Sequence, residues 1–283
     1  MALTVNTNVT SLNVQKNLNR ASDALSTSMQ RLSSGLKINS AKDDAAGLQI
    51  ATRMSSQIRG GTQAIQNAND GISVAQTAEG ALQASTDILQ RMRELAVKAR
   101  NGTNGDKDQE ATNSEFAQMS DELTRISAST NLNGKNLLDG SAGTVTLQVG
   151  ANTGSANHID LVLSGKFDAV SLSVGSGTVA LTGASPSDAA LAADNAITAI
   201  DAAIASINST RASLGASQNR LTSTISNLQN INENTTAAQG RVQDTDFAAE
   251  TANLTKQQTL QQASTAVLAQ ANQLPSAVLK LLQ

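Results

Sequence analysis

The chain has 283 residues, of which 39% are hydrophobic and 1% aromatic, and it contains no tryptophan, tyrosine or cysteine. The absence of cysteine excludes disulfides, thiolate metal sites and a cysteine nucleophile. With 20 Lys and Arg against 23 Asp and Glu, the chain lacks the basic field that would hold a nucleic acid or an anionic membrane.

The composition favours long helices that pack closely. Ala, Leu, Ile and Val must supply the core, and side chains of this size suit helices that repeat their contacts. The sequence has only two prolines, Pro186 and Pro275, and proline is the strongest helix breaker. The Asn- and Thr-rich residues 1–20 lack the compact apolar run of a secretory signal, and we expect no membrane insertion.

The first helix is predicted from an apolar stripe whose members are four and three residues apart. The stripe consists of Val14, Leu18, Ala21, Leu25, Met29, Leu32 and Leu36. Gly35 stands where a left-handed C-terminal residue would end the helix. Ser40 and Asp43 have the spacing of a capping box that would open the next helix. A joint is therefore expected near residues 35–42.

A second helix is expected to end at Asn101 and Gly102 and to be roughly 80 Å long, at about 1.5 Å per residue. Its apolar positions include Ile58, Ile65, Ile72, Leu82, Leu89 and Met92. A shorter third helix is predicted from the stripe Phe116, Met119, Leu123 and Ile126. The sequence Asn-Leu-Asn-Gly at residues 131–134 predicts a turn after this helix.

Between residues 140 and 183 the apolar period changes to two, which predicts short strands joined by hairpins. The alternating sets are Val145, Leu147 and Val149, then Ile159, Leu161 and Leu163, then Val170, Leu172 and Val174, then Val179 and Leu181.

Helical periodicity returns after Pro186, with Ser187 as the expected N-cap. The seam consists of Ile197, Ile200, Ile204, Ile207, Leu214, Leu221, Ile225 and Leu228. Arg211 and Gln218 interrupt it, as register-setting residues do in coiled coils. A last seam consists of Leu260, Val267, Ala271, Leu274, Val278 and Leu281, with Ser264 among them.

The predicted fold is mainly α: a long antiparallel helical coiled coil or bundle formed by the N- and C-terminal halves, with a small β-hairpin region in the middle. Residues 1–44 with 241–283 are expected to form a terminal coiled-coil domain. Residues 45–140 with 187–240 are expected to form a helical bundle, and residues 141–186 a β-hairpin segment.

The terminal stripes are flanked by Gln, Asn, Ser and Thr, so a single pair of terminal helices would be marginal alone. Their natural partner is another copy of the chain. The predicted polymerisation seam consists of Leu18, Leu25, Leu32, Leu260, Val267, Leu274, Val278 and Leu281.

No pattern in the sequence indicates an enzyme or a cofactor. His158 is the only histidine, and it lies in a strand-like run, where a solvent-facing position is expected. The acidic loop at residues 104–110 lacks the sixth-position glycine and the distal Glu of a calcium loop, so it is expected to initiate a helix. The glycines of residues 175–180 open no helix and are expected to form a hairpin turn.

Ordered blocks at both ends resemble the bacterial flagellin family. The N-terminal blocks are LSSGLKINSAKDDAAG (32–47), NANDGI (67–72), EGAL (79–82) and LQRMRELAV (89–97). The C-terminal blocks are LGASQNRL (214–221), DTDFAAE (244–250), QQASTAVLAQANQ (261–273) and VLKLLQ (278–283). The resemblance covers residues 1–140 and 187–283, and loosely VTLQVG (145–150), so the chain is similar to a short form without large outer domains.

The resemblance implies a secreted structural subunit of the extracellular flagellar filament, which serves motility. The family's route is export in an unfolded state through the flagellar type III channel, with an export chaperone at the C-terminal region. In this family each exported subunit is added to the filament beneath the filament cap, and the filament stands on hook-filament junction proteins. The resemblance also implies an inner tube formed by residues 1–44 and 241–283, and a helical homopolymer.

Two innate immune contacts are implied by the same resemblance. The stretch bound by the vertebrate flagellin receptor matches Arg91, Leu95 and Glu115, although Met92 stands where many members have Val. The intracellular sensor block matches Val278, Leu279, Leu281 and Leu282. Gln283 replaces the Arg that often ends this block.

Three other kinds of protein share some of these features. A hook-filament junction protein shares the terminal seams. A flagellin with a metalloprotease insert would need the two histidines of an H-E-x-x-H motif. A secreted coiled-coil adaptor or adhesin would show heptads without the quoted blocks.

Overall fold

The structure is a computed structural model that describes the backbone of residues 7–183 and 185–281, and their side chains apart from residues 186 and 274–281. The helices are α1 (Val9–Ser34), α2 (Ala45–Ala99), α3 (Asp106–Ser129), α4 (Pro186–Gln243) and α5 (Phe247–Leu281), with the short 3-10 helix η1 (Ser155–Asn157). The strands are β1 (Asn131–Leu132), β2 (Lys135–Asn136), β3 (Gly143–Gln148) and β4 (His158–Leu163). The predicted mainly α fold with a small β region is confirmed.

The chain forms two compact units, Met1–Ile58 with Glu233–Gln283, and Arg59–Asn232. The boundaries fall inside α2 and α4, and the β3–β4 hairpin belongs to the second unit. The three-part division with boundaries near residues 44, 141, 187 and 241 stays a prediction.

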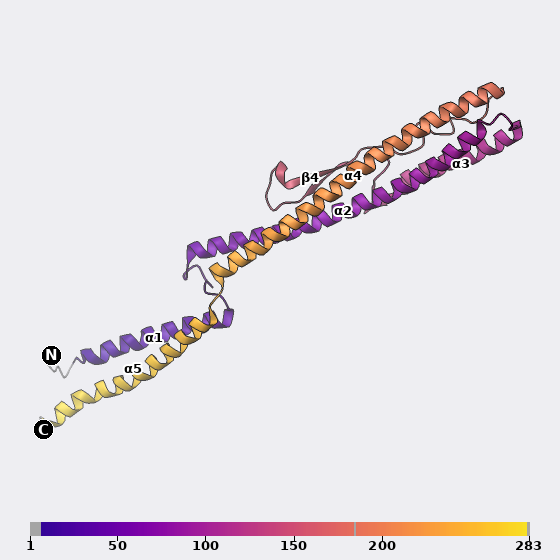
Figure 1. Ribbon diagram of the computed structural model, residues 1–283. Helices are drawn as coiled ribbons and strands as arrows, with labels where there is room; N and C mark the ends of the chain where they lie inside the picture. Colours follow the sequence, from indigo (N-terminus) through magenta and orange to yellow (C-terminus); the bar gives the residue numbers. More distant parts are fainter. Residues whose placement is uncertain (1–6, 184, 282–283) are drawn as a thin grey trace. The chain divides into compact units, whose positions relative to one another are not determined.

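In the first unit α1 and α5 lie side by side (Figure 1). Gly35 ends α1 with a φ of 73°, and its N–H donates to the Arg31 carbonyl oxygen. This left-handed conformation costs glycine little because it has no Cβ. The predicted end of the first helix is confirmed.

The predicted capping box at the start of α2 is wrong in position. Ser40 and Asp43 do interact, but they close a turn ahead of the helix. Asp44 caps α2 instead, because its Oδ1 accepts the Gly47 N–H at 2.9 Å. Because Asp44, directly before the first helical residue, caps α2, Ser40 and Asp43 instead stabilise the turn that precedes the helix.

In the second unit α2 and α4 run antiparallel. Gln218 Nε2 donates to Glu79 Oε2 at 2.9 Å, and Arg93 Nε donates to Asp201 Oδ1 at 2.8 Å. The polar interruption predicted at Gln218 is thus paired across the seam, which fixes helix register. The Arg211 Nε at the other predicted interruption is buried and has no hydrogen-bond partner in the structure.

The core of the second unit lies between α2, α3, α4 and the β3–β4 hairpin, and small and aliphatic residues dominate it as the composition predicted. Its largest fully buried side chains are Leu82, Leu89, Met92, Leu95, Phe116, Leu123, Leu137, Leu138, Leu161, Leu163, Leu181 and Ile200.

The β3–β4 hairpin packs on α2 where a glycine makes room. The strands pair antiparallel, with Val145 opposite Leu161. A Cβ at Gly71 would approach the Leu147 side chain impossibly closely, so glycine permits this packing. Asn67 Nδ2 also donates to the Gln148 carbonyl oxygen at 3.0 Å. The first two predicted strands are confirmed.

The strands predicted at residues 170–174 and 179–181 are wrong. Both segments are turns or irregular backbone, although Val174 and Leu181 are fully buried. Their N–H groups use other acceptors: Val174 N donates to the Ala169 carbonyl and Leu181 N to the Asn113 side chain. Alternating apolar side chains can be buried without a neighbouring strand when their backbone N–H groups find other acceptors.

The predicted N-cap of α4 at Ser187 is also wrong. The helix begins at Pro186, and Ser185 Oγ accepts the Asp188 N–H at 3.3 Å. Proline suits the first helical position because the N–H that it lacks would have no partner there.

The third helix and the turn after it follow the sequence prediction. Phe116 and Leu123 of its stripe are buried. Asn133 and Gly134 adopt left-handed φ angles of 52° and 77° between β1 and β2. This is the two-residue turn that Asn-Gly favours.

Candidate assembly interface

The face of α1 toward α5 is a heptad stripe with a polar gap. Its buried and half-buried positions are Ser11, Val14, Leu18, Ala21, Ala24, Leu25, Ser28, Arg31 and Leu32. Leu18, Leu25 and Leu32 therefore lie at the intramolecular seam. Met29 is 57% exposed, so its predicted place on the stripe is wrong and the small Ser28 occupies that place.

The matching face of α5 is half polar. Its buried and half-buried positions are Glu250, Leu254, Gln257, Gln261, Ser264, Leu268 and Ala271. Leu260 and Val267 lie beside this stripe and are 44% and 47% exposed. Two residues of the predicted polymerisation seam, Leu260 and Val267, therefore remain exposed when α1 packs against α5.

Five further predicted positions cannot be placed by their contacts. Leu274, Val278, Leu279 and Leu281 belong to α5, but their side chains lie outside the described residues, as does all of Leu282. Their roles in the polymerisation seam and in the sensor block stay predictions.

Polar contacts hold both ends of the α1–α5 pair. At the free end, Asn8 Nδ2 donates to the Ala271 carbonyl at 2.8 Å, and Ser11 Oγ donates to Asn272 Oδ1 at 2.9 Å. At the other end Arg31 Nη1 lies 3.7 Å from Glu250 Oε2, and the Glu250 residue is only 8% exposed. These contacts fix the antiparallel register where the seam itself has few apolar side chains.

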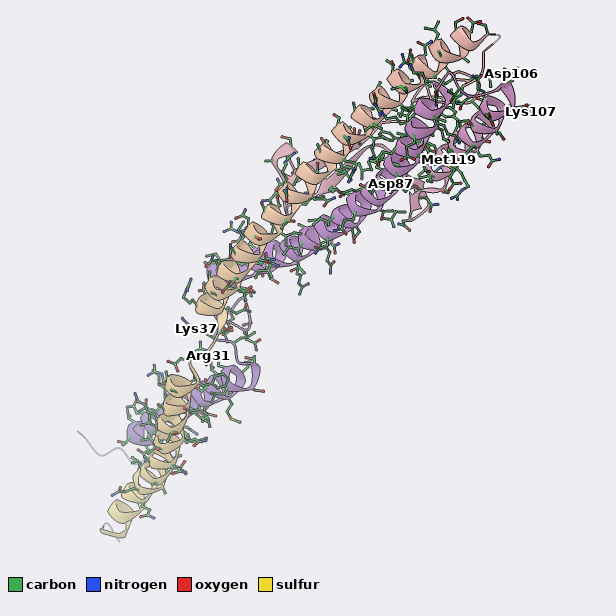
Figure 2. The ribbon with its side chains drawn as sticks, turned by 45° about the vertical axis from the view of Figure 1, so that its right-hand side comes forward. Arg31, Lys37, Asp87, Asp106, Lys107 and Met119 are labelled. Atoms are coloured by element: carbon green, nitrogen blue, oxygen red, sulfur yellow. The ribbon has the colours of Figure 1, made fainter. Side chains whose placement is uncertain are left out.

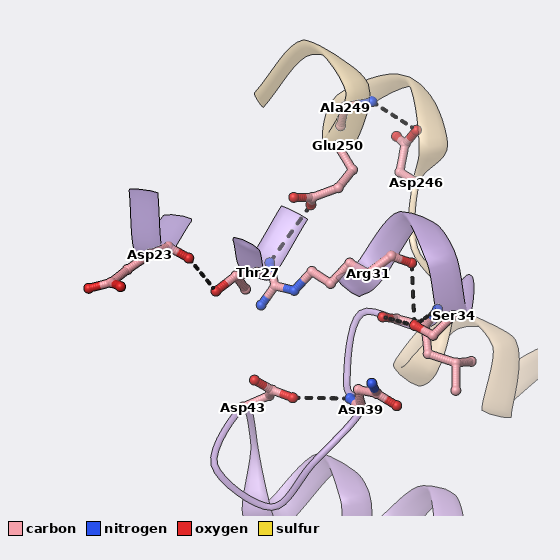
Figure 3. A network of polar contacts seen from close by, with 10 residues as sticks. Asp23, Thr27, Arg31, Ser34, Asn39, Asp43, Asp246, Ala249 and Glu250 are labelled. Atoms are coloured by element: carbon pink, nitrogen blue, oxygen red, sulfur yellow. Dashed lines mark hydrogen bonds and ion pairs between the residues drawn. The ribbon is translucent and has the colours of Figure 1, made fainter. Parts of the chain in front are cut away.

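The joint between α1 and α2 lies against the joint between α4 and α5 (Figure 3). Lys37 N donates to the Gln243 carbonyl at 2.7 Å, and Thr245 N donates to the Gly35 carbonyl at 2.9 Å. Two backbone hydrogen bonds therefore tie together segments about two hundred residues apart in sequence. The flagellin-like blocks at residues 32–47 and 244–250 meet here.

Carboxylates shape both joints. The N–H groups of Ser40 and Asn39 donate to Asp43 and lower the pKa of its carboxyl group. Asp246 Oδ1 accepts the N–H groups of Ala248 and Ala249 at 2.9 and 3.2 Å, so Asp246 caps α5. Acceptors at these positions satisfy N–H groups that a helix cannot pair internally.

The first unit exposes many large apolar side chains. Among the side chains that the structure describes, those at least 38% exposed are Val9, Leu12, Met29, Ile50, Phe247, Leu260 and Val267. They occur on both terminal helices and beside the joint. Exposed apolar side chains on both helices of a pair whose own seam is half polar leave apolar surface that a further chain can cover.

The residues matched to the receptor stretch divide between surface and core. Arg91 Nη2 donates to Glu115 Oε1 at 2.8 Å, and Arg91 Nη1 donates to Glu94 Oε2 at 2.8 Å. These hydrogen bonds, first to Glu115 and then to Glu94, raise the pKa of Arg91. Leu95 is 2% exposed and packs in the core. Of the three matched residues, Leu95 is therefore the one whose side chain is not on the surface.

The described residues contain no group of three or more His, Cys, Asp and Glu side chains that could hold a metal ion. His158 is exposed on β4, as predicted. The acidic loop at residues 104–110 initiates α3, where Gly105 N donates to Asp108 Oδ2 at 3.2 Å.

Within the described part of the chain, one helix, over Ser187–Gln243, is long and apolar enough by length and composition to cross a membrane. A core helix passes the same test, and Ile200, Ile207 and Leu214 of this helix are buried. Its apolar face is already occupied within the second unit.

Comparison with known proteins identifies the terminal regions. The bacterial flagellin N-terminal helical region matches residues 5–143, and the C-terminal helical region matches residues 197–282. Polar flagellin C of Vibrio parahaemolyticus is 37% identical and flagellin B of Vibrio cholerae is 39% identical, each over 100% of both chains.

A solved structure described as a flagellar hook-associated protein from Vibrio parahaemolyticus covers 71% of this chain and 100% of its own. Its TM-score is 0.59 at 16% identity, which shows the fold alone.

Paired terminal helices, an exposed apolar surface and matches at both ends define the class: a structural subunit of the flagellar filament. The chain belongs to the bacterial flagellin family. Its alignment with polar flagellin C spans 384 positions, so that relative has residues that this 283-residue chain lacks. Residues 144–196 lie outside both matched regions, and they include nearly all of the β-hairpin segment predicted at residues 141–186.

Proposed function

We propose that α1 and α5 form the subunit contacts of the filament and that the exposed apolar side chains of the first unit are buried by neighbouring copies. The observation that carries this proposal is the exposure of Leu260 and Val267 beside a half-polar intramolecular seam. Burial of apolar surface stabilises association by about 25 cal/mol per Å². Repetition in a helical array lets every subunit use both sides of the same contact.

Further steps of the proposal rest on the family resemblance. The subunit is exported unfolded by the flagellar type III pathway, accompanied by an export chaperone, and is added at a cap above the hook-filament junction proteins. The mature product is an extracellular filament that serves motility. No catalytic activity or cofactor is proposed.

Electron microscopy and sedimentation of the concentrated protein, with and without filament seeds, test the central proposal. We expect long filaments of this chain alone. A junction protein, the alternative within the same class, would join the end of a preformed filament without extending it. Failure to elongate any seed would contradict the proposed function.

Limited proteolysis should distinguish the terminal helices of the monomer from those of the filament. We expect protease to trim both ends of the monomer and to leave a core near residues 45–240. The physical reason is the half-polar α1–α5 seam, whose local opening requires little free energy. Mass spectrometry of the fragments measures the boundaries. Equal protection of both ends in monomer and filament would contradict this expectation.

We also propose that the subunit is a ligand of the vertebrate flagellin receptor, through Arg91 and Glu115. Arg91→Ala should weaken receptor signalling by monomer about tenfold or more, the effect of removing an arginine anchor from an interface. Circular dichroism should stay unchanged, because Arg91 is exposed.

Arg125→Ala is the matched control, since Arg125 is also exposed and pairs with a carboxylate three residues away, Glu122. Its dose response in a receptor reporter assay should equal that of the unaltered protein. Equal signalling by the Arg91 and Arg125 variants would remove Arg91 from the receptor contact.

A further inference from the structure

Three Asn-Gly pairs occur in the sequence, at Asn101, Asn104 and Asn133. Asn-Gly is the dipeptide most prone to spontaneous deamidation, because glycine offers no side chain to block attack by its backbone nitrogen on the asparagine side chain. In a folded protein, the hydrogen bonds and backbone conformation around each pair decide whether this attack can occur. The three pairs differ in both respects.

Asn104 is restrained on both sides of the reacting bond. Its side-chain Nδ2 donates to the Lys98 carbonyl at 2.6 Å, and the Gly105 N–H donates to Asp108 Oδ2 at 3.2 Å. Attack requires both groups to leave these partners. The helix cap at the start of α3 would be lost at the same time.

Asn133 is restrained by its turn. It has a φ of 52° and is followed by Gly134 at 77°, and the flanking residues Leu132 and Lys135 pair across β1 and β2. Ring closure requires rotation about the Asn133 Cα–C bond. This rotation takes the residue out of the left-handed turn that holds the two strands in register.

Asn101 is held less tightly. Its N–H donates to the Lys98 carbonyl at 3.2 Å and its carbonyl accepts the Asn104 N–H at 3.1 Å, but neither hydrogen bond engages the two reacting groups. Among the described contacts, no hydrogen bond involves the Gly102 N–H or the Asn101 Nδ2. The Asn101 Oδ1 accepts only the Thr103 N–H, at 3.4 Å, which is a weak bond. Both Asn101 and Gly102 are exposed in the loop that follows α2, and in Figure 2 the labelled Asp106 and Lys107 mark the helix after this loop.

We propose that Asn101 is a site of spontaneous deamidation in the folded subunit. The Gly102 nitrogen loses its proton to solvent and bonds to the Asn101 Cγ. The side-chain NH2 group then takes a proton from solvent, its bond to Cγ breaks, and it leaves as ammonia. Water opens the resulting five-membered imide at either carbonyl carbon and yields aspartate or isoaspartate at residue 101.

The modification changes the end of α2. It places a carboxylate two residues beyond Ala99, next to helix carbonyl groups that already carry partial negative charge. The isoaspartate product also inserts a methylene group into the backbone between α2 and α3. Each modified subunit thereby gains one negative charge on the surface of the second unit.

The test compares folded and urea-denatured full-length protein during incubation at neutral pH. In urea all three Asn-Gly pairs should react at similar rates. In the folded protein Asn101 should react at nearly its denatured rate, whereas Asn104 and Asn133 should react at least about tenfold more slowly. Trypsin cleaves after Arg100 and Lys107, so Asn101 and Asn104 share one peptide and fragment-ion sequencing must separate them.

Two glycine variants provide the matched comparison. A Cβ at Gly102 would meet no atom within 4 Å, and one at Gly105 would meet only Asp108 at 3.7 Å, so both Gly102→Ala and Gly105→Ala should fold. Gly102→Ala should slow deamidation of Asn101 about tenfold or more, because the Ala methyl group stiffens the loop and hinders attack. Gly105→Ala should leave that rate unchanged. Protection of Asn101 in the folded protein equal to that of Asn104, or an unaltered rate in Gly102→Ala, would overturn the proposal.

Discussion

Val267→Asp is expected to abolish filament formation while leaving the soluble subunit folded. Val267 is 47% exposed and lies beside the α1–α5 seam. An exposed substitution of this kind changes the stability of the monomer by about 0.5 kcal/mol or less. In the proposed interface the new carboxylate would be buried without a partner, which costs several kcal/mol unless it protonates. The cost recurs at every subunit of the helical array.

Seeded polymerisation followed by sedimentation measures the loss, and thermal unfolding of the unpolymerised protein measures the stability of the subunit. Gln262→Glu is the control, because it adds one negative charge at an exposed polar position on the same helix. It should still polymerise. Normal filaments from Val267→Asp would show that this face of α5 forms no subunit contact. A large fall in the unfolding temperature would show that the residue stabilises the monomer instead.

Phe116→Ala is expected to destabilise the second unit by about 3–5 kcal/mol, the usual cost of truncating a buried phenylalanine. Phe116 is 0% exposed and lies in the core with Leu82, Leu123 and Leu181. Urea unfolding monitored by circular dichroism measures the change in the free energy of unfolding.

Phe247→Ala is the matched substitution on the surface. Phe247 begins α5 and is 56% exposed, so its truncation should change the free energy of unfolding by about 0.5 kcal/mol or less. If the two variants were equally stable, Phe116 would not be the packing centre that its burial indicates. Together they separate loss of core packing from loss of an aromatic side chain.

The helices were predictable because their evidence is local. Periodicity, Gly35 and Asn101 predicted where α1 and α2 end, and the stripe of α3 buries Phe116 and Leu123 as expected. The hairpin turn at Asn133 was equally clear. Each of these signals depends on neighbouring residues of one element, and therefore needs no knowledge of the partner.

Helix starts were predicted less well than helix ends. Ser40 with Asp43, and Ser187, are acceptable caps by residue type, but Asp44 and Ser185 have those roles. Several polar residues precede each helix, and only the backbone path selects the side chain whose oxygen reaches the first free N–H groups.

The sequence by itself determined that this chain is a mainly α flagellin with apolar stripes at both ends, because periodicity and ordered blocks are properties of the chain alone. The tertiary structure decided which side of each stripe is used: Ser28 rather than Met29 is buried in α1, and Leu260 and Val267 stay exposed on α5. It also decided that Leu95 is buried beside an exposed Arg91, and that residues 170–181 pack without pairing as strands. An apolar stripe covers a broad arc of a helix. The backbone N–H and C=O groups of a strand-like run can find hydrogen-bond partners in several conformations. Only the position of the packed partner selects the arc and the hydrogen bonds that are formed.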